Sequence, residues 1–131
     1  MSARTSPMDA QAVHARALQA RAFLEAARLQ LGDSPAGNSV AGTDAVHAGI
    51  AAADAICGKT LGYCARGESH QEAVDLLARA IPDSSPSKHL ARLLSQKSLA
   101  GYSPAMLSNA KTADLVKYAE RLLAVMEDVL R

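Results

Sequence analysis

Four polar side chains interrupt otherwise apolar helical patterns in this sequence: Asp54, His70, Lys97 and Tyr102. A carboxylate, an imidazole and an ammonium group, brought together, could transfer protons or hold an anionic ligand. Because burying an unpaired charge is costly, we expect such groups to pair with one another or to reach solvent at an end of the fold. Two interpretations stay open. The pattern favours a hydrogen-bonded structural cluster, and the alternative is a ligand-binding or catalytic site.

The sequence contains no metal-binding or nucleotide-binding motif. Its four histidines, His14, His47, His70 and His89, lie in separate segments, and no HExxH, paired CxxC or EF-hand pattern occurs. Neither a P-loop nor a dinucleotide-binding glycine pattern is present. We therefore expect neither a metal nor a cofactor.

The two cysteines, Cys57 and Cys64, fall on the apolar stripe of one expected helix. At the helical rise they would be roughly 10 Å apart, which is too far for a disulfide within a straight helix. We expect free, buried thiols, as in a reducing cytoplasm. A nucleophilic dyad of Cys64 with His70 is the alternative, but cysteines on an apolar stripe favour a core role.

The composition indicates a small all-α protein. Alanine (28 residues) and leucine (16) far outnumber isoleucine and valine (10 together), and tryptophan is absent. Alanine and leucine are the best helix formers, whereas sheets need more β-branched and aromatic residues. A chain of 131 residues corresponds to one domain, 1–131, and its net charge of +1 argues against a dedicated nucleic-acid or membrane-surface binder. With no secretory signal and no membrane-spanning run, we expect a cytoplasmic protein.

Apolar residues at helical spacing predict an up-and-down bundle of about five helices. The first starts at Pro7 with Ser6 as its N-cap and stops at Gly32, after a flexible segment 1–6. The glycine- and serine-rich stretch 32–44 is expected to form the longest loop. The later helices are predicted at 44–66, ended by Gly67, at 70–81 behind a Ser69–Glu72 capping box, after Pro86, and at 109–130.

The second predicted helix carries a face of small residues: Ala51, Ala55, Gly58 and Gly62. Glycine within a helix is about 1 kcal/mol less favourable than alanine, so two of them call for a packing explanation. A second helix could approach closely here, either within the bundle or across the axis of a homodimer. The sequence does not decide between these two arrangements.

The order of these features resembles small bacterial HEPN-domain proteins. The segment AVHAGIAAADAICGKTLGYCARG leads directly into ESHQEAVDLL, and KSLAGYSPAMLS precedes the amphipathic NAKTADLVKYAERLLAVM. The matching positions are Ala53–Ala55, His70 and Lys97–Tyr102, and the resemblance covers residues 40–128. It implies an up-and-down helical bundle that commonly dimerises.

Many HEPN proteins are metal-independent ribonucleases, whose signature is an arginine followed by a histidine four to six residues later, brought together across a dimer. The resemblance assigns proton transfer to His70 and phosphate stabilisation to Arg66. Only three residues separate them here, and Glu68 places a negative charge where an RNA phosphate would sit. This departure from the signature favours a family member without catalysis.

We therefore carry three hypotheses. The leading one is a non-catalytic or partner-dependent HEPN-like protein that forms a homodimer and acts by binding protein, nucleotide or RNA, with a nucleotidyltransferase or an antitoxin as its partner. The second is a ribonuclease with a composite site of Arg66 and His70. The third is a purely structural scaffold, in which Asp54, His70, Lys97 and Tyr102 only stabilise the fold.

Overall fold

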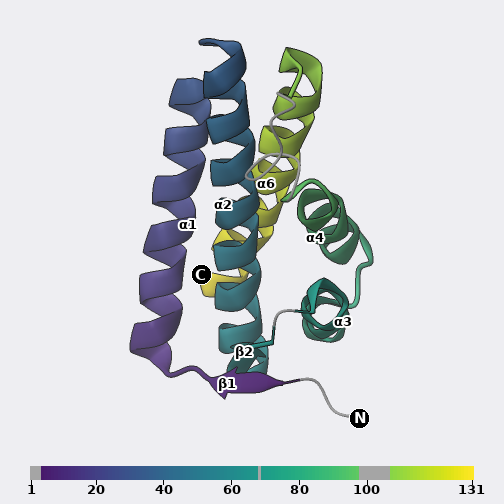
Figure 1. Ribbon diagram of the computed structural model, residues 1–131. Helices are drawn as coiled ribbons and strands as arrows, with labels where there is room; N and C mark the ends of the chain where they lie inside the picture. Colours follow the sequence, from purple (N-terminus) through teal and green to yellow (C-terminus); the bar gives the residue numbers. More distant parts are fainter. Residues whose placement is uncertain (1–3, 68, 98–106) are drawn as a thin grey trace.

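The computed structural model describes residues 4–67, 69–97 and 107–131, and this part of the chain is a helical bundle. Helices α1 and α2 are antiparallel, α3 and α4 return the chain along the side of α2, and α6 runs in the same direction as α2 (Figure 1). The prediction of an all-α bundle is therefore confirmed. The elements are β1 (Thr5–Pro7), α1 (Ala10–Gln30), α2 (Pro35–Leu61), β2 (Tyr63–Ala65), α3 (His70–Ala80), α4 (Ser85–Ser95) and α6 (Asn109–Leu130).

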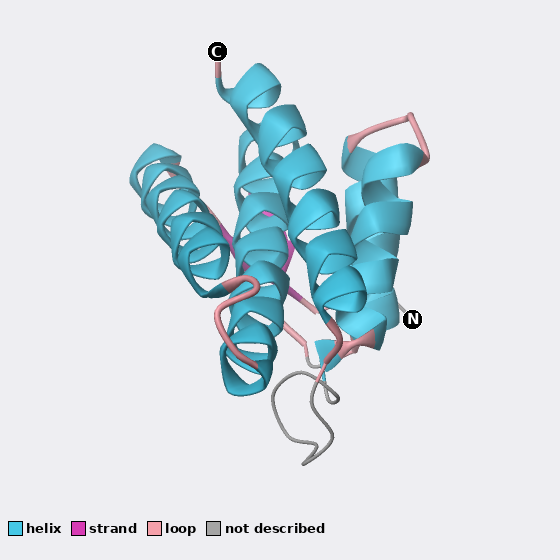
Figure 2. Cartoon of the chain, turned by 90° about the horizontal axis from the view of Figure 1, so that it is seen from above, coloured by secondary structure: helices cyan, strands magenta, loops and turns pink. Residues whose placement is uncertain are grey.

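Helix α2 is the centre of the bundle and contacts α1, α3, α4 and α6. Its alanines allow these neighbours to approach closely, because Ala48, Ala51, Ala52 and Ala55 are all fully buried. The neighbours contribute the large core side chains, among them Leu77, Leu93, Leu122 and Met126. Seen from above, helices make up almost all of the described chain and the strands form only a small patch (Figure 2). Within the described ranges, no helix combines the length and apolar character needed to cross a membrane.

The prediction of a long loop at 32–44 is wrong, because most of this stretch forms the first turns of α2. Ser34 caps the helix by accepting a hydrogen bond from a backbone N–H at 2.9 Å, and Pro35 occupies the first turn, where its missing N–H costs nothing. Asn38 is buried, accepts a hydrogen bond from the preceding turn and donates one to Asn109 at the start of α6. Burial thus outweighs the loop-like composition.

The N-terminal segment forms a strand where a helix start was predicted. Strands β1 and β2 pair antiparallel, with Ser6 opposite Cys64. Helix α1 consequently begins at Ala10, and Asp9 is its N-cap, with a carboxylate oxygen 2.8 Å from a backbone nitrogen of the first turn. The prediction that Ser6 caps the helix and Pro7 begins it is wrong, and Ser6 is held in the sheet rather than in a flexible tail.

Helix α2 also ends earlier than predicted, at Leu61 instead of Arg66. Gly62 has a φ of +86°, a left-handed conformation that side-chain-bearing residues rarely adopt, and its N–H donates to the carbonyl of Gly58 at 3.0 Å. This glycine stops the helix before Gly67, the predicted stop, is reached. The chain then enters β2.

The starts of α3 and α6 match the prediction. Helix α3 begins at His70, with the hydroxyl of Ser69 accepting a hydrogen bond from the N–H of Glu72 at 3.3 Å. Helix α6 begins at Asn109 behind an equivalent serine cap and continues to Leu130. Strong caps in front of clear apolar periodicity therefore located both helices correctly.

The small face proposed for a homodimer is used inside the chain. Ala51 and Ala55 are fully buried, and Gly58 is buried against the start of α1. A Cβ at Gly58 would lie 2.8 Å from both Met8 Sδ and Val13 Cγ2, so glycine is required for this close approach. Of the two arrangements left open for Ala51, Ala55, Gly58 and Gly62, packing within the bundle accounts for the first three, and Gly62 ends the helix, so these residues do not require a dimer face.

Candidate functional site

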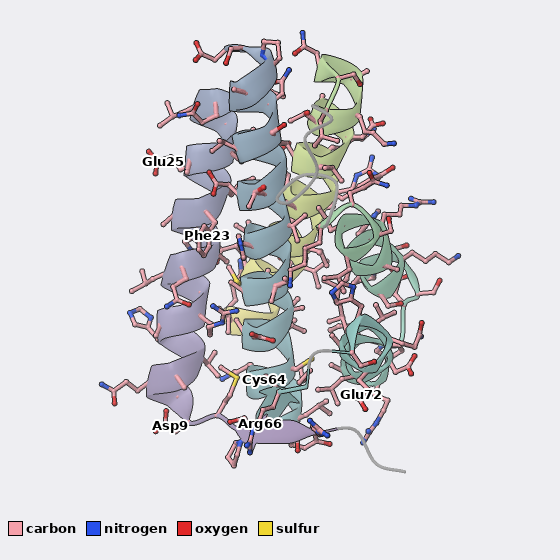
Figure 3. All side chains as sticks on the ribbon, in the orientation of Figure 1. Asp9, Phe23, Glu25, Cys64, Arg66 and Glu72 are labelled. Atoms are coloured by element: carbon pink, nitrogen blue, oxygen red, sulfur yellow. The ribbon has the colours of Figure 1, made fainter. Side chains whose placement is uncertain are left out.

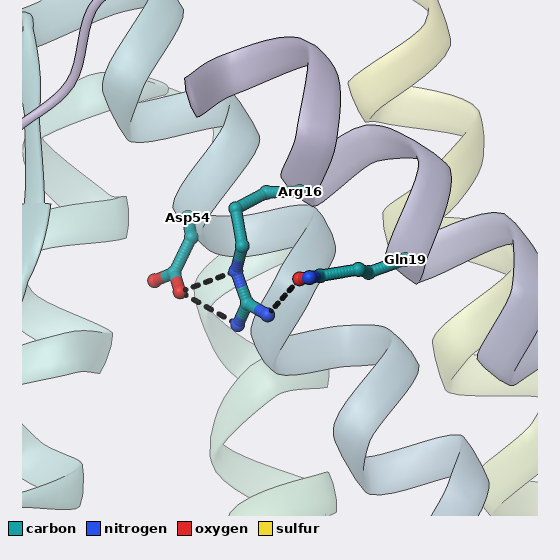
Figure 4. A network of polar contacts seen from close by, with 3 residues as sticks. All are labelled: Arg16, Gln19 and Asp54. Atoms are coloured by element: carbon teal, nitrogen blue, oxygen red, sulfur yellow. Dashed lines mark hydrogen bonds and ion pairs between the residues drawn. The ribbon is translucent and has the colours of Figure 1, made fainter. Parts of the chain in front are cut away.

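Asp54 and His70, two of the four polar residues expected to form a cluster, do not pair with each other in the described structure. Asp54 faces α1, where its partner is Arg16, as Figure 4 shows. His70 is exposed at the start of α3, and Lys97 is half-buried just beyond α4. Tyr102 lies outside the described residues. The prediction of one cluster is thus wrong for Asp54 and His70, because α1 supplies the partner of Asp54 instead.

The ion pair of Arg16 with Asp54 is a structural contact between α1 and α2. The guanidinium donates to Asp54 Oδ2 from Nε at 3.1 Å and from Nη2 at 2.8 Å, while Nη1 donates to Gln19. Burial raises the pKa of Asp54, and the charge and hydrogen bonds of Arg16 act in the opposite direction. The carboxylate therefore depends on Arg16 for its charge to be tolerated.

The proposed catalytic residues, Arg66 and His70, are both exposed. Arg66 lies at the end of the molecule that carries the two strands (Figure 3), and His70 is the first residue of α3. Arg66 is fixed through its backbone, which donates to the carbonyl of Arg4 at 2.9 Å. A Cβ at Gly67 would lie 2.8 Å from Glu72 Oε2, so a carboxylate lies beside the segment that joins the two residues. Within the described residues no hydrogen bond holds either side chain in place, and the nearby negative charge opposes phosphate binding.

A different set of side chains converges on a cavity between α4 and α6. The cavity has a volume of about 260 Å³, and Arg92, Gln96, Lys111, Asp114 and Tyr118 contribute to its wall. Two cations from two helices thus share one cavity with a single carboxylate among its described lining residues. Arginine and lysine are the side chains that proteins use most to bind phosphate and carboxylate groups.

Tyr118 is held in place by α4 from the side of the cavity. Its ring stacks on His89, with centroids 5.5 Å apart and planes inclined by 21°. The guanidinium carbon of Arg92 lies 5.3 Å from the centre of the same ring, a cation–π contact. These contacts fix the aromatic ring and the guanidinium group in advance, which lowers the entropy cost of binding a ligand.

His89 lies near two arginines on this side of the bundle. Burial is the largest influence that lowers the pKa of His89, followed by the positive charges of Arg121 and Arg92, while Asp83 opposes them. The four ion pairs in the described chain lie elsewhere, on α1 and at the end of α6. The cations around this cavity therefore lack an acidic partner within 4 Å among the described residues.

Two buried polar atoms at this place have no hydrogen-bond partner in the described residues: Nδ1 of His89 and Oε1 of Gln96. Buried polar atoms in folded proteins are nearly always satisfied by protein or water. Gln96 lines the cavity, but its amide oxygen is shielded from solvent. The cavity accordingly offers two cations, one carboxylate and an aromatic ring.

Sequence analysis missed this site because its residues come from two separate helices. Tyr118 fell on the apolar stripe of the last helix, and Lys111 is one of many charged residues on solvated faces. The available signal was spacing: His89, Arg92 and Gln96 recur at intervals of three and four residues, which places them on one face of α4. The sequence alone does not show that this face of α4 packs against Tyr118 on α6.

The chain matches no protein-family model, no curated protein and no solved structure with which it was compared. Both cysteines are free thiols, as expected, although only Cys57 is buried and Cys64 is half-exposed in β2. Within the described ranges, no three acidic, histidine or cysteine side chains are grouped as a metal site would require.

Proposed function

We propose that this protein binds a small phosphate ester, such as a nucleoside monophosphate, in the cavity between α4 and α6, and performs no chemistry of its own. The observation that carries the proposal is that Arg92 and Lys111 line one cavity and neither has an acidic partner within 4 Å among the described residues. The two cations would bind the phosphate.

The size and charge of the cavity favour a small ligand over a polynucleotide. Its volume of about 260 Å³ is slightly below the range of ~300–1,000 Å³ typical of drug-sized ligands. Polynucleotide binding depends on neutralising several phosphates along an extended basic surface, whereas this chain has a net charge of only +1. Membership of the HEPN family is part of the proposal, since members without the Arg–His signature bind ligands or partners without catalysis.

Calorimetric titration with adenosine monophosphate tests the proposal, with adenosine and inorganic phosphate as the two halves of the ligand. We expect saturable binding of the monophosphate and weaker binding of each half. Arg92→Gln and Lys111→Gln should each weaken binding about tenfold or more, because a hydrogen bond to a charged group contributes about 1.5–3 kcal/mol. Lys88→Gln, on the exposed surface of α4, is the matched control and should bind as the unmodified protein does.

Two results would contradict the proposal. The first is the absence of binding to both the monophosphate and phosphate at millimolar concentration. The second is cleavage of RNA by the purified protein that is lost in Arg66→Ala and His70→Ala, which would establish the ribonuclease instead. A folded state equal to that of the unmodified protein, checked by circular dichroism, is required of every variant.

Self-association is favoured by a separate observation and is proposed as the protein-binding role. The large apolar side chains that are exposed in the described chain, Leu18, Leu29 and Val40, all lie on α1 or the start of α2. On α1 they belong to an exposed row with Ala15 and Ala22, spaced by three, four and seven residues. An antiparallel copy of α1 could match this row, with Leu18 of one copy against Ala22 of the other.

The same antiparallel pairing would bring Glu25 of one copy near His14 of the other, which places a carboxylate beside an imidazole at each end of the contact. Light scattering coupled to size exclusion should find a dimer at micromolar concentration. Leu18→Glu should convert it into a folded monomer, while Arg66→Glu, at the strand end, should leave it dimeric. A monomer at all concentrations would exclude self-association, in which case a nucleotidyltransferase or antitoxin is the partner to test on this surface.

A further inference from the structure

His89 lies next to the wall of the cavity between α4 and α6. Its ring stacks on Tyr118, which lines the cavity, with the two ring centroids 5.5 Å apart. Arg92, a cation of the same cavity, lies over the same tyrosine, with its guanidinium carbon 5.3 Å from the centre of the ring. His89 and Arg92 are three residues apart on α4, which places them on one face of the helix. A group that changes its charge near neutral pH therefore stands beside the proposed anion site.

The charges around the imidazole come from α4, from α6 and from the turn before α4. Burial is the largest influence that lowers the pKa of His89, followed by the charges of Arg121 on α6 and Arg92 on α4, while Asp83 before α4 raises it. Helices α2 and α3 also pack on α4, but among the described residues neither contributes a charge to this shift. Without a ligand, two positive charges against one negative charge favour the neutral ring.

The buried ring nitrogen of His89 leaves its charge state open to the influence of a ligand. Nδ1 is buried and has no hydrogen-bond partner among the described residues. A carboxylate or carbonyl oxygen at this atom would fix a proton on it, and the described structure places none there. The surrounding charge is then the influence that a ligand can change, because the fold buries the ring to the same extent in both states. An anion beside Arg92 would cancel part of the positive charge that acts on the imidazole.

We propose that anion binding in the cavity between α4 and α6 is coupled to the uptake of a proton by His89. This inference rests on the proposed function, since it concerns the same site. An anion bound by Arg92 and Lys111 favours the charged imidazole, and the charged imidazole must favour the bound anion to the same extent, because the two equilibria are linked. The affinity for an anion of constant charge therefore increases as the pH falls through the pKa of His89 in the complex, and levels off below its pKa in the free protein.

An NMR titration of the imidazoles between pH 5 and pH 8 tests the coupling in the unmodified protein, with and without saturating adenosine monophosphate. The resonance of His89 is assigned by its loss in His89→Phe. Saturation should raise the pKa of His89 by about half a pH unit or more, which corresponds to an affinity gain of about threefold or more at low pH. Sodium chloride at the same ionic strength is the control, because screening alone also weakens the effect of the arginines.

Calorimetry at pH 7.5 and pH 5 tests the same coupling from the side of the ligand. The phosphate itself changes charge at about pH 6, so the affinity of the unmodified protein is divided by that of His89→Phe, which binds the same ligand without the imidazole. This ratio should rise about threefold or more on going to pH 5. Asp114→Asn removes the carboxylate that lines the cavity and is the matched control, in which the coupling should persist because His89 is still present.

The possible failures of the two proposals are distinguishable. Saturable binding of adenosine monophosphate without a change in the titration of His89 would overturn the coupling and leave the proposed function standing. A coupling that disappears in Asp114→Asn would also overturn it, because the proton would then belong to that carboxylate. Absence of binding at both pH values would overturn the proposed function, and the coupling with it.

Discussion

The guanidinium group of Arg16 donates two hydrogen bonds to a single carboxylate oxygen of Asp54, at 3.1 and 2.8 Å. The side chains are 30% and 19% exposed, so the pair is shielded from solvent more than the other ion pairs of the described chain. A pair of this kind stabilises more than a surface pair, because removing one partner leaves the other charge partly buried. It therefore fixes how α1 lies against α2.

A double-mutant cycle on Arg16 and Asp54 is expected to show this coupling. Arg16→Ala and Asp54→Ala should each destabilise the fold, and the cycle should give a coupling of about 1–2 kcal/mol in chemical denaturation. The pair of Arg21 with Glu127 is the control. Its side chains are 42% and 41% exposed, so screening by water should hold its coupling to about 0–1 kcal/mol. Equal coupling in both cycles would contradict the structural role of Asp54.

Because α4 lies close to α2 at Gly49, an added methyl group at this position should destabilise the fold. A Cβ at Gly49 would lie 2.5 Å from Leu93 Cδ1, and Leu93 is fully buried, so it cannot move aside freely. Gly49→Ala gains about 1 kcal/mol of helix propensity but over-packs the core at a cost of about 1–3 kcal/mol. Thermal unfolding should show a lower melting temperature.

A matched control separates propensity from packing at this site. Ala78 is exposed on α3, so Ala78→Gly measures the difference in helix propensity between alanine and glycine without a change in core packing. If Gly49→Ala is combined with Leu93→Val, the added methyl group gains room and part of the stability should return. A more stable Gly49→Ala variant would mean that α4 does not approach α2 this closely in solution.

Periodicity predicted the elements whose burial matches their sequence pattern. On α1, Val13, Ala17 and Leu24 recur at helical spacing and are all buried, as predicted. The stretch 35–43 has the glycine, serine and asparagine of a loop, yet it is helical because Asn38 finds buried partners in the turn before it and in α6. Local composition cannot reveal a partner that is distant in the sequence.

The same limit explains the outcome for the candidate site. Asp54 was recognised as an anomaly on an apolar stripe, but Arg16 was not, because a charged residue beside a helical stripe is ordinary. The cavity between α4 and α6 depends on two faces that are each unremarkable, and only their contact joins Arg92 to Lys111. Sequence reasoning therefore found the residues that violate a local pattern and missed those that acquire a role by packing.

The two thiols should differ in reactivity by their surroundings. Burial and the charge of Asp54 raise the pKa of Cys57 to about 12, so this thiol stays protonated at neutral pH. Cys64 is less buried, and its pKa is raised too, mainly by burial. We expect a thiol-specific dye to label Cys64 slowly and Cys57 only on unfolding. Cys64→Ser should leave no labelling in the folded state, whereas rapid labelling of that variant would contradict the burial of Cys57.

The pH dependence of stability should report on His89. Burial and the charges of Arg121 and Arg92 lower its pKa in the folded protein, so folding favours the neutral ring. The resulting stability is present above pH 6.5, the ordinary value, and is lost as the pH falls from there through the lower folded pKa. His89→Phe keeps an aromatic ring next to Tyr118 but removes the titration.

Melting temperatures measured between pH 7.5 and pH 5 should therefore fall less in His89→Phe than in the unmodified protein. Burial raises the pKa of Asp54 and of Asp44, so their contribution to the stability of the fold has the opposite pH dependence and decreases as the pH rises. Comparing the two proteins cancels their contribution, because both carboxylates are present in each. Parallel curves for His89→Phe and the unmodified protein would show that His89 titrates without restraint from its cationic neighbours.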